Sequence, residues 1–248
     1  MSLAIEALQL PSGSWGLDAG CGIGSHTVLL AEAAAPRGNV TGLDLSAHLL
    51  QQARKRTEGS VLADSVSWVE GDIAALPFSD GAFDWAWSVD CVGLIPARPE
   101  LLLGQLARVV KPGGSLAILV WSSQQLLPGY PLVEARLNAT SLGVAPFTRG
   151  MSPERHHLRA LGWFRDAGLV EPKARTFVGD VHAPLDDAVR SALISLLEMR
   201  WGDARSELSE EDWATYRRLS EPDSPEFIVD SPDYYAFFTY SMFQGTVP

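Results

Sequence analysis

A glycine-rich segment near the start of the chain limits the folds that it can adopt. Gly20, Gly22 and Gly24 alternate with other residues between an apolar stretch and a segment of helical spacing that begins at Ser25. Because glycine has no side chain, such a turn lets a ligand lie on the backbone, and the first N–H groups of the following helix face that ligand unpaired. The sequence therefore predicts a strand, a ligand-binding turn and a helix.

The spacing of these glycines distinguishes between kinds of nucleotide ligand. The dinucleotide fingerprint is G-x-G-x-x-G, and aligning its first glycines on Gly20 and Gly22 leaves Ser25 where the third glycine belongs. The chain has Asp-x-Gly-x-Gly-x-Gly instead, and the acid is Asp18. A carboxylate there would repel a pyrophosphate but would suit a ligand that carries an ammonium group. A nicotinamide-dependent oxidoreductase is therefore disfavoured.

Two more carboxylates follow predicted strands. Asp44 ends the second strand about 20 residues after Gly24, which is the spacing that brings a ribose-binding acid beside the glycine turn in a βαβ unit. Ser46 is the N-cap candidate for the next helix, so capping does not account for Asp44. Asp72 likewise follows the alternating stretch 66–70. A capping aspartate is the competing interpretation for Asp72.

Together these residues resemble the class I S-adenosylmethionine-dependent methyltransferases. The glycine turn with Asp18 resembles their first motif, and Asp44 and Asp72 follow in register. Further similarity, to the methyltransferases of quinone biosynthesis and their small-molecule relatives, rests on Leu76-Pro77-Phe78, Phe83-Asp84 and Lys111-Pro112-Gly113-Gly114. The resemblance covers residues 14–121 and keeps both the order and the spacing of the motifs.

The resemblance implies an α/β, Rossmann-like fold. It predicts a seven-stranded, mostly parallel sheet with an antiparallel last strand and helices on both faces. The apolar run Ser115–Trp121 and the aromatic stretch Tyr234–Phe243 are typical of two of its strands. Ser152 and Pro153 predict the start of a helix that Gly168 ends. We expect residues 1–248 to form a single methyltransferase domain.

Two inserted segments are expected to make a helical cover over the substrate. They span about residues 123–150 and 183–232, after the predicted fifth and sixth strands, and both are rich in Leu, Trp and Tyr. Loops that follow parallel strands project at the edge where ligands bind in this fold. Ser209 with Asp212 predicts the N-cap of one helix there. The alternative is that both segments merely extend the core.

The resemblance also implies a cofactor, S-adenosylmethionine, and residues that bind it. Asp44 would accept the ribose hydroxyls, Asp72 would accept the exocyclic amine of adenine, and Ile73 would pack on the ring. The complete set of expected cofactor-binding residues is Asp18, Gly20, Cys21, Gly22, Gly24, Asp44, Leu45, Gly71, Asp72, Ile73 and Ser88.

The expected reaction is in-line transfer of a methyl group from a sulfonium, for which the protein mainly positions two partners and excludes water. An oxygen acceptor would need a base, and the candidates are Asp90 after the fourth strand and His182 at the end of the sixth. Relatives often have a histidine pair where this chain has Asp90 to Ile95. Because the sequence has no His, Cys and carboxylate cluster at metal-binding spacing, we expect a metal-independent reaction.

The composition limits the class of methyl acceptor and the cellular compartment that we expect. The formal net charge of −11 disfavours a nucleic-acid substrate. Hydrophobic residues make up 46% of the chain, but no apolar run approaches the roughly 18 residues of a membrane span, and no leader peptide precedes the glycine turn. The only cysteines, Cys21 and Cys91, give no disulfide framework, so we expect a cytoplasmic protein.

The sequence thus predicts a methyltransferase of a small, largely apolar or aromatic metabolite. Two alternatives stay open. The chain could be a non-catalytic S-adenosylmethionine-binding module, or it could methylate a protein, since an acidic surface would attract a basic peptide.

Overall fold

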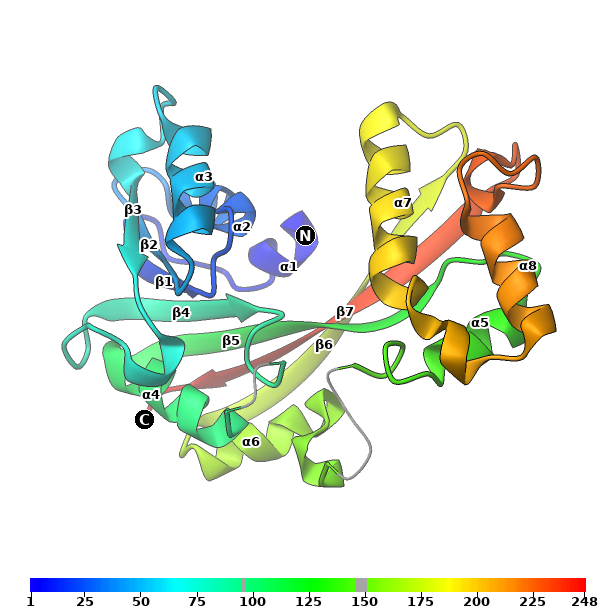
Figure 1. Ribbon diagram of the computed structural model, residues 1–248. Coiled ribbons are helices and arrows are strands. Elements are labelled where there is room, and N and C mark those ends of the chain that lie inside the picture. Colours follow the sequence, from blue (N-terminus) through cyan, green and yellow to red (C-terminus); the bar gives the residue numbers. More distant parts are fainter. Residues whose placement is uncertain (95–96, 146–150) are drawn as a thin grey trace. The chain divides into compact units, whose positions relative to one another are not determined.

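The computed structural model describes residues 1–94, 97–145 and 151–248 (Figure 1). A 7-stranded sheet has the order β3-β2-β1-β4-β5-β7-β6, which confirms the predicted fold class. Its strands are β1 (Trp15–Ala19), β2 (Asn39–Asp44), β3 (Val66–Glu70), β4 (Phe83–Val89), β5 (Val110–Gln125), β6 (Val170–His182) and β7 (Tyr235–Thr246).

Two compact units make up the chain. The first comprises Met1–Trp121, Ser152–Phe177 and Tyr240–Pro248, and the second comprises Ser122–Met151 and Val178–Thr239. The helices of the first unit are α1 (Ser2–Glu6), α2 (Ser25–Ala34), α3 (Ala47–Thr57), α4 (Pro99–Val109) and α6 (Ala160–Asp166). Those of the second unit are α5 (Pro131–Asn138), α7 (Asp187–Trp201) and α8 (Glu210–Ser220).

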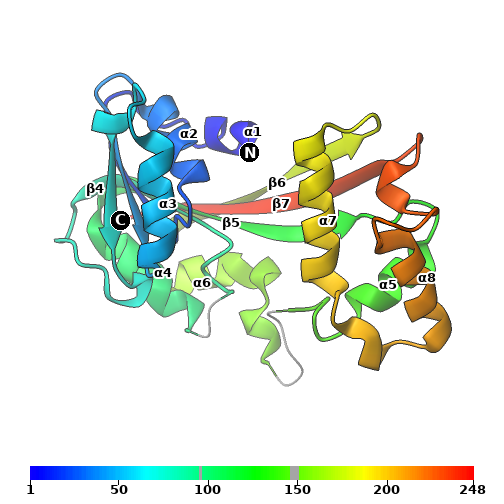
Figure 2. The same ribbon diagram turned by 45° about the horizontal axis from the view of Figure 1, so that its top comes forward.

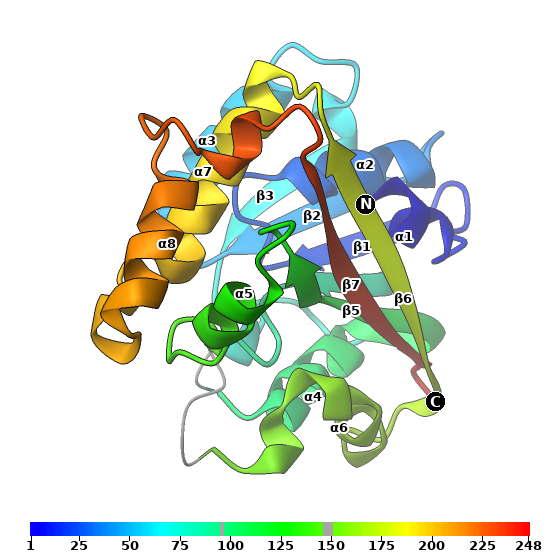
Figure 3. The ribbon, with the colours of Figure 1, turned by 90° about the vertical axis from the view of Figure 1, so that its right-hand side faces the viewer.

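The sheet combines parallel and antiparallel pairs. Strands β1 to β5 pair in parallel, as β1 does with β2 and β4. Strand β7 runs against β5, because Gly113 N donates to Val247 O at 2.8 Å near the start of β5, whereas Ser122 Oγ donates to Thr239 O at 3.2 Å farther along it. Figure 3 shows β5, β7 and β6 side by side, with β7 in the opposite direction.

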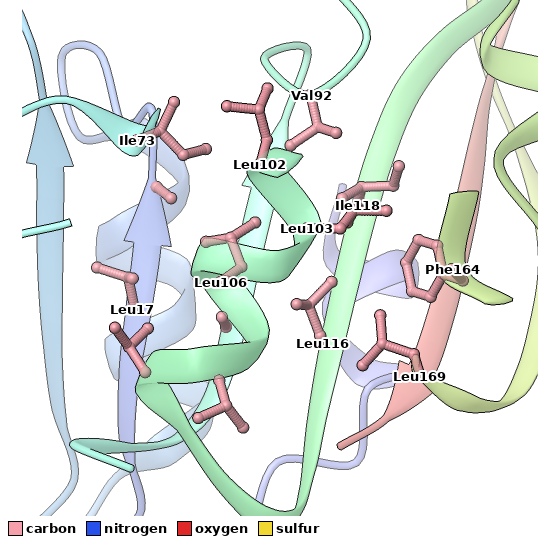
Figure 4. Packing of buried hydrophobic residues seen from close by; sticks show 14 of the residues in the cluster. Leu17, Ile73, Val92, Leu102, Leu103, Leu106, Leu116, Ile118, Phe164 and Leu169 are labelled. Atoms are coloured by element: carbon pink, nitrogen blue, oxygen red, sulfur yellow. The ribbon is translucent and has the colours of Figure 1, made fainter. Parts of the chain in front are cut away.

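Helices cover both faces of the sheet in the first unit. On one face, α4 and α6 bury Leu102, Leu106 and Phe164 against Leu17 of β1 and Ile118 of β5, as Figure 4 shows. The other face packs against α1, α2 and α3 (Figure 1). Parallel strands buried on both faces are expected to be continuously apolar, and this is how the run from Leu116 to Val120 reads.

Close packing of a tryptophan against a glycine fixes the middle of this sheet. Trp85 of β4 is 1% exposed, and its Nε1 donates to Ser14 Oγ at 2.9 Å. The indole ring occupies the space beside Gly16 of β1, where an added Cβ would lie 2.0 Å from a ring carbon. Only a residue without a side chain therefore fits at Gly16.

The second unit has a core of its own, formed by α5, α7, α8 and the chain beside them (Figure 2). Trp201, Tyr216 and Tyr234 are fully buried in it. Glu134 is 1% exposed and accepts hydrogen bonds from the Leu126 and Leu127 amides at 2.7 and 3.0 Å. The two expected cover segments, 123–150 and 183–232, fall within this unit, except that 146–150 lie outside the described residues.

Two local predictions met different outcomes. Ser209 caps α8 by accepting a hydrogen bond from Asp212 N at 3.1 Å, as predicted. The helix expected to start at Ser152 was wrong over its first half, where the chain forms two 3₁₀ turns, 153–155 and 157–159, and α6 begins only at Ala160. Between the turns His156 has an extended backbone (φ −70°, ψ 132°), which interrupts the helix. The Glu154 carbonyl accepts a hydrogen bond from Trp163 Nε1 at 2.6 Å.

Within the described ranges, none of the helices is both long enough and apolar enough to cross a membrane.

Replacing Gly16 with Ala should destabilise the protein by about 1–3 kcal/mol or more, because the new methyl group would overlap the buried Trp85 ring. Gly104→Ala is the matched control, since Gly104 lies within α4 and an added Cβ there meets nothing within 4 Å. That control should raise stability by about 0.5–1 kcal/mol through helix propensity. Urea unfolding of both variants measures the difference, and equal midpoints would contradict the packing argument.

Candidate functional site

The glycine turn joins β1 to α2, as predicted, and its glycines face different surroundings. Gly20, Gly22 and Gly24 have φ angles of +79°, +53° and +76°. An added Cβ would lie 2.9 Å from Cys91 Sγ at Gly20 and 2.3 Å from the Trp68 ring at Gly24, whereas at Gly22 it would meet nothing within 4 Å. The turn is therefore packed against protein at its two ends and open at its middle residue.

Asp44, at the end of β2, holds this turn in place. Its Oδ2 accepts a hydrogen bond from Gly22 N at 2.8 Å, and its Oδ1 accepts one from Ser46 N at 2.9 Å. Ser46 caps α3, as predicted, by accepting a bond from Leu49 N. Since each carboxylate oxygen has two lone pairs, Asp44 retains acceptor capacity toward a ligand at the open middle of the turn.

Asp18 lies beneath the turn at the end of β1. It is 1% exposed, and its Oδ2 accepts a hydrogen bond from Thr27 Oγ1 of α2 at 2.6 Å. Burial raises the pKa of Asp18 to about 7; the Thr27 bond opposes this shift, and the charge of Asp44 adds to it. Neutral and ionised Asp18 are therefore close in free energy near neutral pH, so that a nearby positive charge favours the ionised form.

Asp72 and the apolar residues beside it form the next part of the site. Asp72 Oδ1 accepts a hydrogen bond from Ala74 N at 2.8 Å, which is the capping role weighed as its alternative. In the described part of the chain no side-chain or backbone donor is recorded for Asp72 Oδ2. Ile73 is 6% exposed, whereas Leu45, which follows Asp44, is 71% exposed. Leu45 thus presents an uncovered apolar surface next to the carboxylate.

The other predicted residues support the turn from within the protein. Ser88 is 1% exposed and donates its hydroxyl hydrogen bond to Ala19 O at 2.8 Å, which ties the end of β4 to the end of β1. Cys21 is 8% exposed, and burial raises the pKa of its thiol well above the usual range. Gly71 donates its amide hydrogen to Asp44 O at 3.0 Å.

Sequence reasoning did not place Thr27 or Cys91 at this site. Thr27 follows the glycine turn within the first turn of α2, so its position on the helix could have indicated that it meets Asp18. The pKa of Cys91 is raised to about 11, mainly by burial and in smaller part by the charges of Asp44, Asp18 and Asp72. These charges act on Cys91 because the loop after β4 lies against the same turn, which the chain sequence alone does not show.

Of the two candidate bases, Asp90 lies in the first unit, directly after β4. It has a φ of +45°, and its pKa is raised mainly by burial. Its Oδ1 accepts a hydrogen bond from Trp121 N at 2.7 Å, and its Oδ2 accepts one from Tyr240 Oη at 3.0 Å. Asp90 is adjacent in sequence to Cys91, whose sulfur packs against Gly20 of the turn.

The other candidate, His182, lies in the second unit at the end of β6 and is exposed. Its Nδ1 is 2.9 Å from Ala183 O, so Nδ1 is the protonated donor of this pair. In the neutral ring this tautomer leaves the lone pair on Nε2, where a proton can be accepted. Among the residues that the structure describes, no group of three or more His, Cys, Asp or Glu could hold a metal ion.

Comparison of the chain with known proteins identifies the family to which it belongs. Residues 17–118 match the model of a methyltransferase domain. The chain is 31% identical over 193 residues to a demethylmenaquinone methyltransferase of Staphylococcus carnosus (strain TM300), an alignment that covers 72% of this chain and 77% of the relative. A demethylmenaquinone methyltransferase of Staphylococcus aureus (strain JH9) is 30% identical over 196 residues, with the same coverage.

Solved structures agree on the fold. A putative methyltransferase from Bacillus halodurans superposes with a TM-score of 0.59 and 19% identity over 100% of this chain and 98% of its own. The chain carries the ordered motifs, the strand order and the sequence similarity of one enzyme family. It is an S-adenosylmethionine-dependent methyltransferase and belongs to class I, to the type found in quinone biosynthesis.

Proposed function

We propose that this methyltransferase acts on a small, largely apolar or aromatic metabolite. The supporting observation is the similarity to demethylmenaquinone methyltransferases, which spans 72% of the chain and 77% of the relative and so extends beyond the cofactor motifs. The names of those relatives describe an acceptor with an apolar, aromatic ring system. The competing proposal is a basic protein substrate, to which the net charge of −11 would contribute an attraction.

The residues of the glycine turn fit the cofactor. The middle of the turn is open at Gly22, Asp44 keeps free acceptor capacity beside it, and Leu45 offers an exposed apolar surface. We assign Asp44 to the ribose hydroxyls, Asp72 to the exocyclic amine of adenine, and Leu45 with Ile73 to the faces of the ring. When bound, S-adenosylmethionine supplies a methyl group that its sulfonium has already activated.

Because the methyl group arrives activated, the protein needs no metal in this proposal. Its residues orient the two partners and keep water away from them. Asp18 contributes a negative charge beneath the turn, which favours a cationic ligand over a neutral one. The turn is supported from within the protein by Ser88, Cys21 and Gly71, which are assigned no direct part in the reaction.

The second unit is proposed to supply the apolar surface for the acceptor. Some of its aromatic residues, such as Trp201 and Tyr216, are fully buried in its own core. For these residues the alternative interpretation, a role in the core, is correct. It also carries large apolar side chains in contact with solvent, including Leu132 at 70% and Met199 at 68% exposed. These exposed side chains give the second unit apolar surface that an acceptor could contact.

If the acceptor is a hydroxyl, we assign the base to Asp90 in preference to His182. Asp90 belongs to the unit that carries the glycine turn, and burial raises the pKa of its carboxyl, which increases its affinity for a proton. His182 has an available Nε2 but belongs to the second unit.

A screen for turnover tests the acceptor class. The protein, incubated with methyl-labelled S-adenosylmethionine, should transfer label to a demethylated naphthoquinol with a short apolar side chain, offered beside a basic peptide and an RNA. With an active hydroxyl acceptor, Asp90→Asn should lower kcat about 10²- to 10⁴-fold. Label found in the peptide or the RNA but never in the small molecules would overturn the proposed acceptor class.

The assignment of Asp44 predicts weaker cofactor binding when its side chain is removed. Asp44→Ala loses the ribose contacts and also the bond to Gly22 N that shapes the turn. The loss should be about 2–3 kcal/mol, or roughly 30- to 100-fold in Kd, by calorimetry with S-adenosylhomocysteine. Asp64→Ala, at an exposed acid outside the site, is the matched control and should bind normally. Equal affinities of the two variants would remove Asp44 from the site.

The raised pKa of Asp18 predicts a pH dependence of cofactor affinity. Below its pKa of about 7 the group is neutral and must release a proton before it can favour a cation. Because about half of Asp18 is ionised at pH 7 and about a tenth at pH 6, the affinity for S-adenosylmethionine should fall about fivefold between these pH values. Asp18→Asn, which keeps an acceptor for Thr27, should bind more weakly at pH 7.5 and lose this dependence. Burial lowers the pKa of His26 in α2, which is the direction that keeps this imidazole neutral at neutral pH.

A further inference from the structure

We propose that Tyr240 is a positioning residue for methyl transfer, and that it acts by fixing the carboxylate of Asp90 in its proton-accepting state. This inference rests on the proposed function, in which Asp90 is the base for a hydroxyl acceptor. Tyr240 stands in β7, 150 residues after Asp90 in the chain.

The carboxylate of Asp90 is held at both oxygens by two different strands. Trp121 N of β5 donates to Oδ1 at 2.7 Å, and Tyr240 Oη of β7 donates to Oδ2 at 3.0 Å. The backbone of Asp90 is fixed as well, because its amide donates to Leu119 O at 2.9 Å. Each oxygen keeps a second lone pair, so these bonds orient the carboxylate without exhausting its capacity to accept a proton.

Tyr240 is itself held firmly. Its ring meets the Trp121 ring edge to face, with centroids 5.4 Å apart and an interplanar angle of 72°. The ring also packs against the buried cluster that contains Trp87 and Leu119. The next residue of β7, Ser241, has its Oγ 3.1 Å from Thr176 Oγ1 of β6. A donor placed this way loses little further freedom when Asp90 ionises.

The electrostatic effects of the pair favour one arrangement of protons. Burial and the neighbouring charge of Asp90 push the pKa of Tyr240 well above its usual range, so the tyrosine stays protonated and donates. Its hydrogen bond lowers the pKa of Asp90 against the larger effect of burial. The other ionisable group next to Asp90 on its own segment is Cys91, whose thiol is neutral at physiological pH because its pKa is about 11.

The proton is transferred between the acceptor and Asp90 alone. The hydroxyl proton of the acceptor moves to Asp90, which becomes a neutral carboxylic acid, while the acceptor oxygen gains the negative charge that makes it a nucleophile. Tyr240 keeps its own proton throughout. Without the tyrosine hydroxyl, the ionised carboxylate would lose a partner, and its pKa would rise.

The test compares Tyr240→Phe with a matched control, Tyr234→Phe. Tyr234 is a buried tyrosine, 1% exposed, that likewise donates a hydrogen bond, to Leu126 O at 3.2 Å, but it lies in the second unit. Both variants remove one hydrogen-bonding hydroxyl and keep the aromatic ring. Carbon-13 NMR of labelled aspartate carboxyls, with the Asp90 signal assigned through Asp90→Asn, gives the pKa of Asp90 directly. The pH profile of kcat gives its effect on turnover.

We expect Tyr240→Phe to raise the pKa of Asp90 by about one pH unit and to move the acid limb of the kcat profile by the same amount. Tyr234→Phe should change neither quantity. An acid limb that keeps its position in Tyr240→Phe would overturn the proposal, as would an unchanged carboxyl titration. If the native protein methylates no acceptor, the proposed function fails, and the NMR titration still decides whether Tyr240 governs Asp90.

Discussion

The hydrogen bond between Gly22 N and the carboxylate of Asp44 is the contact around which the cofactor site is arranged. It joins the turn after β1 to the end of β2, at 2.8 Å. A turn of three glycines with positive φ has many accessible conformations in the unfolded chain, and an external acceptor is needed to select one of them. Because the same carboxylate also holds Ser46 N, it fixes the start of α3 together with the turn.

The electrostatic character of the site follows from this arrangement. Bringing Asp44 to the turn places it near Asp18, which burial has already made costly to ionise. The charges of both reach Cys91 on the loop after β4. Repulsion among these carboxylates raises the free energy of the empty site. A bound cation reduces that repulsion, which is the property required for a sulfonium ligand. Selectivity for charge is therefore built into the elements that form the fold.

The sequence was most informative where function depends on consecutive residues. Gly20 to Gly24, Asp44 with the Ser46 cap, and the apolar run of β5 could all be predicted from spacing and composition. The first half of the predicted helix at Ser152 does not form. There the Trp163 side chain donates to Glu154 O and the Arg155 side chain donates to the distant Ala97 O, and these contacts outweigh the local helix signal.

Residues that meet through strand pairing were beyond reach of the sequence. Tyr240 faces Asp90 only because β7 inserts between β5 and β6, and neither residue carries a motif that indicates the other. The same holds for Gly16. Only glycine fits at this position because the indole of Trp85, on the adjacent strand, occupies the space where a side chain would lie. Local pattern locates elements, whereas these pairs depend on the register between elements.

The separation of 150 residues between Asp90 and Tyr240 has a consequence for how the protein is made on the ribosome. The glycine turn, Asp44 and Asp72 all emerge early, and their contacts span short stretches of chain, so this part can fold while synthesis continues. Strand β7, which carries Tyr240, follows all of these elements in the chain and so leaves the ribosome after them. A nascent chain can thus assemble its cofactor turn well before the carboxylate of Asp90 acquires its tyrosine partner, and synthesis of β7 is the event that completes the proton-accepting pair.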